Sequence, residues 1–371
     1  MSFFKRHRTY LGVDIGTASI KVVELAPGPN RTPRLMTYGR AEYTGDAAKV
    51  DAERDIQRIV TTLKAICTQA HTTSRRVSAA LPTFAVFSSV ITLPTMSEKE
   101  LAAAIRWEAR KFVPLPLEEM ILDWKFLADT PPAALPAARP GDTVRATNIV
   151  GKEEEAAAKK NIRVLLTAAP QNLVKKYLTI FKGAELELLS LETEAFALER
   201  SLVGGARAIV MIVDLGAVTT DICVIENGIP ILNRSIDVGG LTMTKAIAGS
   251  LNVDVKRAEQ FKRDIGLNTR GAAAGIPSTI ENTISPVVNE IKYNFSLYQS
   301  QSAQPIEKII LTGGSSFLPM LPEYLENLFQ IKVYIGDPWA RISYPEELKP
   351  VLDEVGPQFA SAIGLAMRQL I

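Results

Sequence analysis

Two short segments with the same residue pattern lie 200 positions apart and carry the residues best suited to chemistry. Residues 14–21 read DIGTASIK and residues 214–221 read DLGAVTTD, each after one apolar run and before another. A single Asp-x-Gly of this kind is usually plain turn chemistry, because Asp bonds to its own backbone and Gly tolerates unusual conformations. Two copies in matching contexts predict a duplicated domain. Its two turns would face each other across a cleft, where successive backbone N–H groups bind an anion.

The expected anion is a polyphosphate. The carboxylates of Asp14 and Asp214 would repel a bare phosphate, so we expect Mg²⁺ between them, held largely through water. Lys21 supplies a compact positive charge for phosphate oxygens. The other groups expected at this part of the cofactor belong to Gly16, Thr17, Ala18, Ser19, Gly216, Ala217, Thr219, Thr220, Gly239 and Gly240.

A third segment, residues 309–316 (IILTGGSS), is an apolar strand that runs into paired glycines. Glycine lets a flat ring lie against the backbone, and ligands of open α/β sheets bind beyond the strand ends. A strand-to-helix turn would explain this segment alone, but it explains three such segments in this order poorly. We therefore expect adenosine at Gly313, Gly314, Ser315 and Ser316.

The composition is that of a globular protein long enough for two lobes. The chain has 371 residues, of which 47% are hydrophobic and 22% charged, and its formal net charge is +2. This balance does not call for a nucleic-acid partner. Cys67 and Cys223 lie too far apart in sequence for a zinc motif or a disulfide framework, which favours a reducing compartment. No apolar run reaches the roughly 20 residues that a membrane helix requires, and the basic residues 1–8 are expected to form a solvated tail.

Hydrophobic periodicity predicts alternating strands and helices in both halves of the chain. In the first half we expect strands at residues 10–15, 20–25, 77–81, 86–93, 120–127, 162–168 and 186–191, and helices at residues 55–70, 97–112 and 171–181. In the second half we expect strands at residues 208–215, 220–226, 229–237 and 306–311, and helices at residues 242–251 and 255–298, the latter interrupted at 266–275. The expected inner sides of two helices are Leu101, Ile105, Glu108 and Phe112, and Leu173, Val174, Tyr177, Leu178 and Phe181.

These elements predict a first lobe, an inserted subdomain and a second lobe. The first lobe takes residues 1–84 and 186–206, and the insertion takes residues 85–185. The second lobe takes residues 207–371, with a smaller helical part at about 246–304. Residues 129–161 are rich in proline and charge, so we expect a mobile excursion within the insertion.

The three glycine-containing segments resemble the actin-like ATPase superfamily, over nearly the whole chain. The resemblance implies an α/β, actin-like ATPase fold of duplicated ribonuclease-H-like lobes with an inserted FtsA-type α+β subdomain. It implies that Glu194 orients the attacking water, that Glu259 and Lys262 contact ribose and base, and that residues 360–366 form a connecting helix at a hinge. From the residues alone, Glu194 is equally a helix-start charge, and Glu259 and Lys262 a surface ion pair.

Within that superfamily the chain is similar to the PilM family of type IV pilus assembly proteins. The similarity lies in FFKR at residues 3–6, EARKFVP at residues 108–114 and LETEAFAL at residues 191–198. It implies a cytoplasmic, ATP-binding scaffold at the inner face of the membrane. Such a scaffold binds the N-terminal cytoplasmic peptide of PilN in a groove beside the insertion. Other pilus platform proteins, motor ATPases and a second copy of the chain are further partners to consider.

Two other functions stay open, an FtsA-like filament-forming cell-division protein and a small-molecule kinase of the same superfamily. FtsA-like proteins continue into an amphipathic membrane-binding helix, whereas this sequence ends at Ile371, so we expect membrane attachment only through partners. Ala18 and Val218 replace the second glycines of actin's turns, and Val218 is poorly suited to positive φ. His7 and His71 lie outside the motifs, so at most a weak ATPase is expected.

Overall fold

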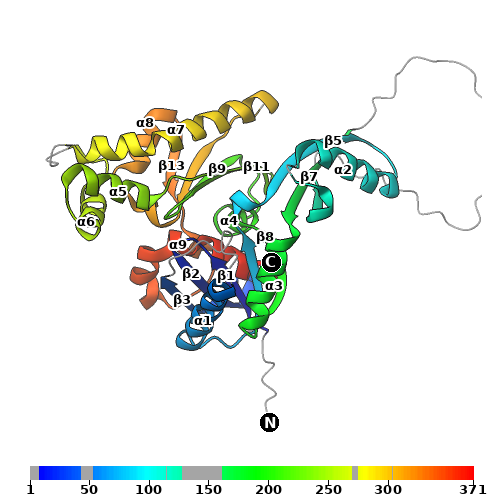
Figure 1. Cartoon of the computed structure of the whole chain (residues 1–371), viewed down its shortest axis with the longest axis horizontal. Coiled ribbons are helices and arrows are strands. Elements are labelled where there is room, and N and C mark those ends of the chain that lie inside the picture. The colour runs from blue at the N-terminus through cyan, green and yellow to red at the C-terminus, as the bar shows by residue number, and fades with distance from the viewer. Residues whose placement is uncertain (1–7, 43–52, 114, 128–160, 270–274, 303) are drawn as a thin grey trace, which may run out of the picture.

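Two five-stranded sheets of the same topology form the centre of the molecule (Figure 1). The computed structural model describes residues 8–42, 53–113, 115–127, 161–269, 275–302 and 304–371. The strand orders are β3-β2-β1-β4-β8 and β11-β10-β9-β12-β13. In each sheet the first three strands form an antiparallel meander, and the last two run parallel to the first strand. The two halves therefore repeat one unit, as the paired motifs predicted.

The central strands are buried apolar runs. The first sheet contains β1 (Tyr10–Ile15), β2 (Ser19–Ala26), β3 (Arg34–Glu42), β4 (Arg76–Leu81) and β8 (Glu187–Thr193). The second contains β9 (Val210–Leu215), β10 (Thr220–Glu226), β11 (Ile229–Ile236), β12 (Lys308–Thr312) and β13 (Lys332–Ile335). Sheets covered on both faces need strands that are apolar throughout, which is why β1 and β9 do not alternate.

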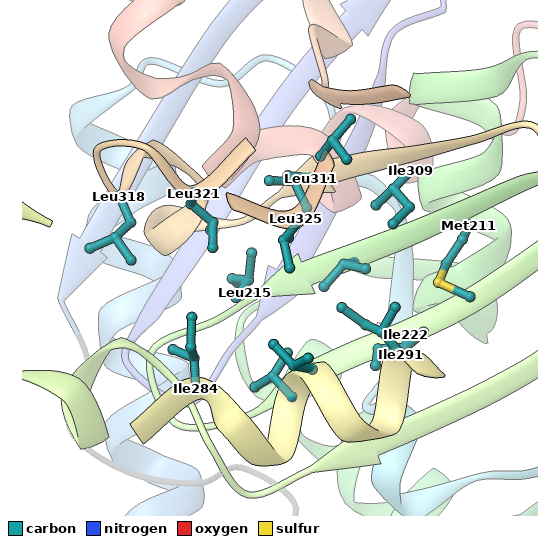
Figure 2. Close-up of a cluster of buried hydrophobic side chains, with 14 of the residues drawn as sticks. Met211, Leu215, Ile222, Ile284, Ile291, Ile309, Leu311, Leu318, Leu321 and Leu325 are labelled. Carbon is teal, nitrogen blue, oxygen red and sulfur yellow. The ribbon is translucent and has the colours of Figure 1, made fainter. Parts of the chain in front are cut away.

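Helices cover the face of each sheet that is turned away from the other lobe. On the first sheet, α1 (Glu53–Gln69) and α3 (Gln171–Gly183) pack through Ile59, Leu63 and Tyr177. On the second sheet lie α5 (Gly240–Leu251), α7 (Ile276–Gln301) and α8 (Leu321–Phe329), with α6 (Val255–Ile265) beside α5. Figure 2 shows Ile284 and Ile291 of α7 facing the side chains of the second sheet.

Two helices that cross closely fill the space between the sheets. They are α4 (Glu194–Leu198), which continues into a π-helical turn, and α9 (Lys349–Met367). A β-carbon on Gly364 of α9 would lie 1.8 Å from the Ala197 carbonyl oxygen, so only glycine permits this crossing. The predicted boundaries assign α9 to the second lobe, yet Phe359 and Ile363 of α9 pack on β2 of the first sheet.

The inserted subdomain is a three-stranded antiparallel sheet with one covering helix. Its strands are β5 (Phe87–Pro94), β6 (Met120–Phe126) and β7 (Asn161–Pro170), in the order β5-β7-β6, and α2 (Glu98–Phe112) packs on one face. The predicted capping box at Ser97 and Glu100 is present. The predicted excursion at residues 129–161 lies outside the described residues, except that Asn161 begins β7.

Some local predictions were wrong for physical reasons. Helix α2 packs through Leu101, Ile105 and Ala109 at a spacing of four, which leaves Phe112 46% exposed. Leu178 of α3 is likewise 51% exposed. Strands β3 and β13 were not predicted, because both are partly exposed edge strands with mixed polar and apolar residues. Within the described residues no helix is long and apolar enough to cross a membrane.

Candidate functional site

The two predicted turns lie opposite each other and line one cavity of about 1050 Å³. Both turns are closed in the same way. The Gly16 N–H donates to the Ser19 carbonyl at 3.1 Å, and the Gly216 N–H donates to the Thr219 carbonyl at 3.0 Å. The sequence-based expectation of a shared cleft between equivalent turns is thus met by the geometry.

Most of the predicted site residues lie on the wall of this cavity. They are Asp14, Gly16, Thr17, Ala18, Ser19, Lys21, Glu194, Asp214, Gly216, Ala217, Thr219, Gly240, Glu259, Lys262, Gly313, Gly314 and Ser315. Thr220, Gly239 and Ser316 are not on the wall. The Thr220 hydroxyl donates to the Val238 carbonyl at 2.6 Å, and the Ser316 hydroxyl donates to the Gly313 carbonyl at 2.7 Å, so these two side chains brace the turns from behind.

The first turn carries a balanced pair of charges. Asp14 at the end of β1 pairs in register with Lys21 of β2. The Lys21 Nζ lies 2.7 Å from the Asp14 Oδ2, and both side chains are mostly buried. The ammonium group of Lys21 is therefore held at the cavity by a carboxylate that keeps its charge compensated.

The second turn carries unbalanced negative charge. In the same register positions, Asp214 of β9 faces Asp221 of β10. Burial, followed by the neighbouring Asp221 carboxylate, raises the pKa of Asp214 to about 7. Burial also raises the pKa of Asp221 to about 6, with Asp14 adding to the effect. Sequence reasoning did not assign Asp221 to the site, although its place opposite Asp214, equivalent to that of Lys21, was a usable signal.

Glu194 brings a further carboxylate to the cavity from between the lobes. It is the first residue of α4, and its Oε2 accepts hydrogen bonds from the Thr83 backbone N–H at 3.1 Å and hydroxyl at 2.9 Å. Burial raises its pKa well above the ordinary value, and the carboxylates of Asp221, Asp14 and Asp214 add to that rise. Glu194 is thus an enclosed group facing the cavity, unlike a solvated helix-start charge.

Glu259 and Lys262 of α6 form an ion pair that is part of the cavity wall. Their charged groups lie 2.7 Å apart, and Lys262 is 8% exposed. The Thr244 hydroxyl donates to Glu259 at 2.6 Å, and the Lys262 ammonium donates to the Gly240 carbonyl at 3.2 Å. These contacts hold α6 against the beginning of α5. The expectation of a surface ion pair is thus wrong for Lys262, which is buried, and both residues line the cavity.

The glycine segment after β12 closes one end of the cavity. Gly313 has a φ of 82°, and a β-carbon there would lie 2.3 Å from the Asp214 Oδ1, so glycine is required. The Gly313 N–H and the Thr312 hydroxyl both donate to the Pro357 carbonyl of α9, at 3.1 and 2.9 Å. Through this contact α9 adds wall residues that sequence reasoning missed, among them Asp353, Glu354, Gln358 and Ser361. No local sequence signal marks them, because only the tertiary fold brings α9 to the cavity.

Metal binding through several direct protein ligands has no support in the described residues, where no group of three or more His, Cys, Asp or Glu side chains is arranged to hold a metal ion. A cation held mainly through water is compatible with that arrangement. The Asp221 Oδ1 is buried and makes no hydrogen bond to the described residues.

Ala18 and Val218 both have negative φ, so the strain expected at Val218 is absent.

Comparison with solved structures places this architecture among actin-like folds. MreB5 of Spiroplasma citri bound to AMPPNP matches with a TM-score of 0.50 at 14% identity, over 96% of this chain and 94% of that one. A PilM-PilN type IV pilus biogenesis complex matches with a TM-score of 0.78 at 27% identity, over 98% of both chains. The protein is thus an actin-like α/β protein with an inserted subdomain.

A comparison of the sequence with protein families shows to which family the chain belongs. The profile of the family described as type IV pilus assembly protein PilM matches residues 12–137 and 147–370, and the chain belongs to this family. The cell division protein FtsA of Neisseria meningitidis is 30% identical over 179 residues, which is 42% of this chain and 41% of that protein. The chain thus matches less than half the length of its curated FtsA relatives.

Proposed function

We propose that this chain is a nucleotide-binding scaffold of a type IV pilus assembly platform, and that it binds ATP with Mg²⁺ and the N-terminal cytoplasmic peptide of PilN. The proposal rests chiefly on two equivalent turns, from two equivalent sheets, that line one cavity with the Gly313 segment. Membership of the PilM family and the similarity to a PilM-PilN complex support the pilus role.

The residues present fit a nucleotide with a hydrated magnesium ion. Lys21 offers a cation for phosphate oxygens. Asp14, Asp214 and Asp221 form a cluster of three carboxyl groups, which would repel a polyphosphate that arrives without a cation. The buried, unpartnered Asp221 Oδ1 provides an acceptor for metal-bound water. The ion would neutralise the carboxylates and the phosphates at once. Glu194, on the cavity wall, is proposed to orient a water molecule, so slow hydrolysis is compatible with the site.

The peptide is proposed to dock beside the inserted subdomain, where α2 ends. Val113 is 8% exposed and belongs to the subdomain core, whereas Leu115 is 44% exposed and available to a partner. Binding of a partner's cytoplasmic peptide would place the chain at the inner face of the membrane. We also propose the division into a first lobe at residues 1–84 and 186–206, an insertion at residues 85–185 and a second lobe from residue 207, except that α9 packs on β2 of the first sheet.

Calorimetric titration with ATP and Mg²⁺, followed by polarisation of labelled PilN peptides, tests both parts of the proposal. We expect nucleotide binding that requires Mg²⁺, and peptide binding that a scrambled peptide does not reproduce. Leu115→Asp should weaken peptide binding at least about tenfold, whereas the matched control Leu328→Asp, at an exposed side chain of α8, should not. If neither ligand binds, the proposal is wrong. ATP-dependent pelleting without peptide binding would instead favour an FtsA-like filament.

A further inference from the structure

The strand β6 has an open edge. It lies at the end of the order β5-β7-β6, so only β7 pairs with it among the described strands. The Leu127 N–H donates to the Arg163 carbonyl of the β7 strand at 3.0 Å. Because backbone groups alternate in direction along an antiparallel strand, those of Leu122, Trp124 and Phe126 point away from β7. The Trp124 N–H accordingly donates to the Asp123 side chain, at 2.9 Å, and not to a neighbouring strand.

The same strand exposes large apolar side chains. Trp124 is 37% exposed and Phe126 is 53% exposed, and with Leu122 they lie on one side of the strand. Ile121 on the other side is 45% exposed. Folded proteins usually shorten, charge or cover such edges, because an open apolar strand is a template for pairing with another chain. An edge of this composition therefore points to a strand that binds here.

We propose that β6 pairs antiparallel with β6 of a second copy of this chain, around a two-fold axis at Trp124. The sequence from Leu122 to Phe126 is self-complementary in that register. Asp123 lies opposite Lys125 of the partner and Lys125 opposite the partner's Asp123, giving two equivalent ion pairs. Trp124 lies opposite its symmetry mate, and Leu122 opposite the partner's Phe126, giving one continuous apolar stripe. The result is a six-stranded sheet shared by two copies.

Charge and backbone direction select this register over its neighbours. A two-fold axis at Asp123 or at Lys125 would place like charges opposite each other. It would also centre the pairing on a residue whose backbone N–H and C=O groups point to β7 and are not available to a second copy. An axis at Leu122 pairs as many strand residues, but it places Asp123 opposite Ile121 and therefore leaves this carboxylate without a cation opposite it. An axis at Trp124 pairs every outward backbone group from Leu122 to Phe126.

The contacts that Asp123 and Lys125 make within one chain do not prevent them from pairing with a second copy. The Asp123 carboxylate accepts the Trp124 N–H in the isolated chain, and it becomes available to Lys125 of the partner once a strand carbonyl takes that N–H. The Lys125 ammonium lies 5.3 Å from the Phe196 ring centre, a weak contact for an exposed cation. The subdomain with β5, β7 and α2 lies at the opposite end of the molecule from α5 and α6 (Figure 1). Pairing through it leaves the cavity open.

Sedimentation of the full chain over a dilution series, with charge-reversal variants, tests this pairing. We expect a reversible dimer for the natural sequence. Asp123→Lys or Lys125→Asp alone should weaken it at least about tenfold, because each change makes both symmetry-related pairs repulsive. The double variant Asp123→Lys/Lys125→Asp restores both pairs and should return the dimer to within about threefold of the natural strength. Glu347→Lys, an exposed charge reversal outside β6, is the control and should have no effect.

Three results would overturn the proposal. One is a chain that stays monomeric at every concentration. Another is a dimer in which the double variant is no stronger than the single variants, since register-specific pairing requires the rescue. The third is a chain that stays monomeric while a PilN peptide slows backbone hydrogen exchange at Trp124 and Phe126, which would assign the edge to a different protein. Slower backbone hydrogen exchange at Trp124 and Phe126 on concentrating the protein would support the pairing directly.

Discussion

The two turns at the cavity are closed by the same backbone hydrogen bond but differ in charge. In both, a glycine N–H closes the turn on a carbonyl three residues ahead. In the first, Asp14 faces Lys21 across the strand pair, and the two charges compensate each other. In the second, Asp214 faces Asp221, and burial raises the pKa of Asp214 to about 7 and that of Asp221 to about 6.

For the proposed binding of nucleotide with Mg²⁺, this difference implies that the two turns have different roles. A turn with a resident cation can receive phosphate directly, whereas a turn with two buried carboxylates holds protons until a metal cation replaces them. The repeated fold thus gives two equivalent turns, and a single position in each, Lys21 or Asp221, decides whether the aspartate opposite it is compensated.

The largest expected effect is the loss of Mg²⁺-dependent nucleotide affinity in Asp214→Ala. We expect a decrease of about 10- to 100-fold in the presence of Mg²⁺, because the second turn loses a carboxylate that orients the hydrated ion. With EDTA the variant should bind nucleotide no worse than the natural chain, since a repulsive charge is gone. Titration calorimetry in both conditions measures this. Unchanged affinity in Mg²⁺ would remove Asp214 from the site.

The first turn should behave differently. Lys21→Met should weaken nucleotide binding about tenfold with Mg²⁺ and with EDTA alike, because it removes a charge-assisted contact to phosphate and leaves Asp14 uncompensated. Lys64→Met, at an exposed ion pair outside the cavity, is the matched control. A loss confined to the Mg²⁺ condition would mean that Lys21 acts through the metal site and that the two turns are not distinct.

The second turn should also make stability depend on pH. The ordinary Asp pKa of 3.8 rises to about 7 for Asp214 on folding, so the folded state binds more protons than the unfolded state between these values. The unfolding free energy of the nucleotide-free protein should therefore fall as pH rises from about 4 to about 7. At about 1.4 kcal/mol for each pH unit, Asp214 contributes at most about 4 kcal/mol to this fall.

Asp214→Asn should flatten that profile, whereas Glu347→Gln, at an exposed carboxylate outside both the cavity and β6, should leave it unchanged. Chemical denaturation at several pH values provides the measurement. Nucleotide affinity in Mg²⁺ should rise over the same range, because the cation must displace the protons. A pH profile of Asp214→Asn that matches the natural chain would show that Asp214 is charged in the folded protein throughout.

The smallest effect is expected for Val218→Gly and Ala18→Gly, which restore the glycines found in actin's turns. Both positions have negative φ, so glycine gains no conformation that the turn needs. Each change should lower the unfolding free energy by about 0.5 to 1 kcal/mol and should alter nucleotide affinity less than about twofold. Denaturation and calorimetry measure these changes. A large gain in affinity for Val218→Gly alone would show that side-chain bulk limits the second turn.

Much of the fold was predictable, because its signals are local. The two Asp-x-Gly turns, the buried runs of β1 and β9 and the capping box at Ser97 were each readable within a few residues. Strands β3 and β13 were missed, since edge strands with mixed residues lack a clear period. The buried side of α2 was predicted wrongly in the second half of the helix. Packing against the sheet, not helix propensity, decides which residues are buried there.

The repeat, the two turns and the glycine segment could be predicted from local patterns, because each depends on the conformational preferences of a few neighbouring residues. Which charges meet in the cavity depends on how distant parts of the chain pack together. Glu194, Asp214 and Asp221 come from three different elements, and their raised pKa values arise from mutual repulsion and burial, which no local pattern encodes. The same holds for α9, which reaches the cavity because Gly364 lets it cross α4 at close contact.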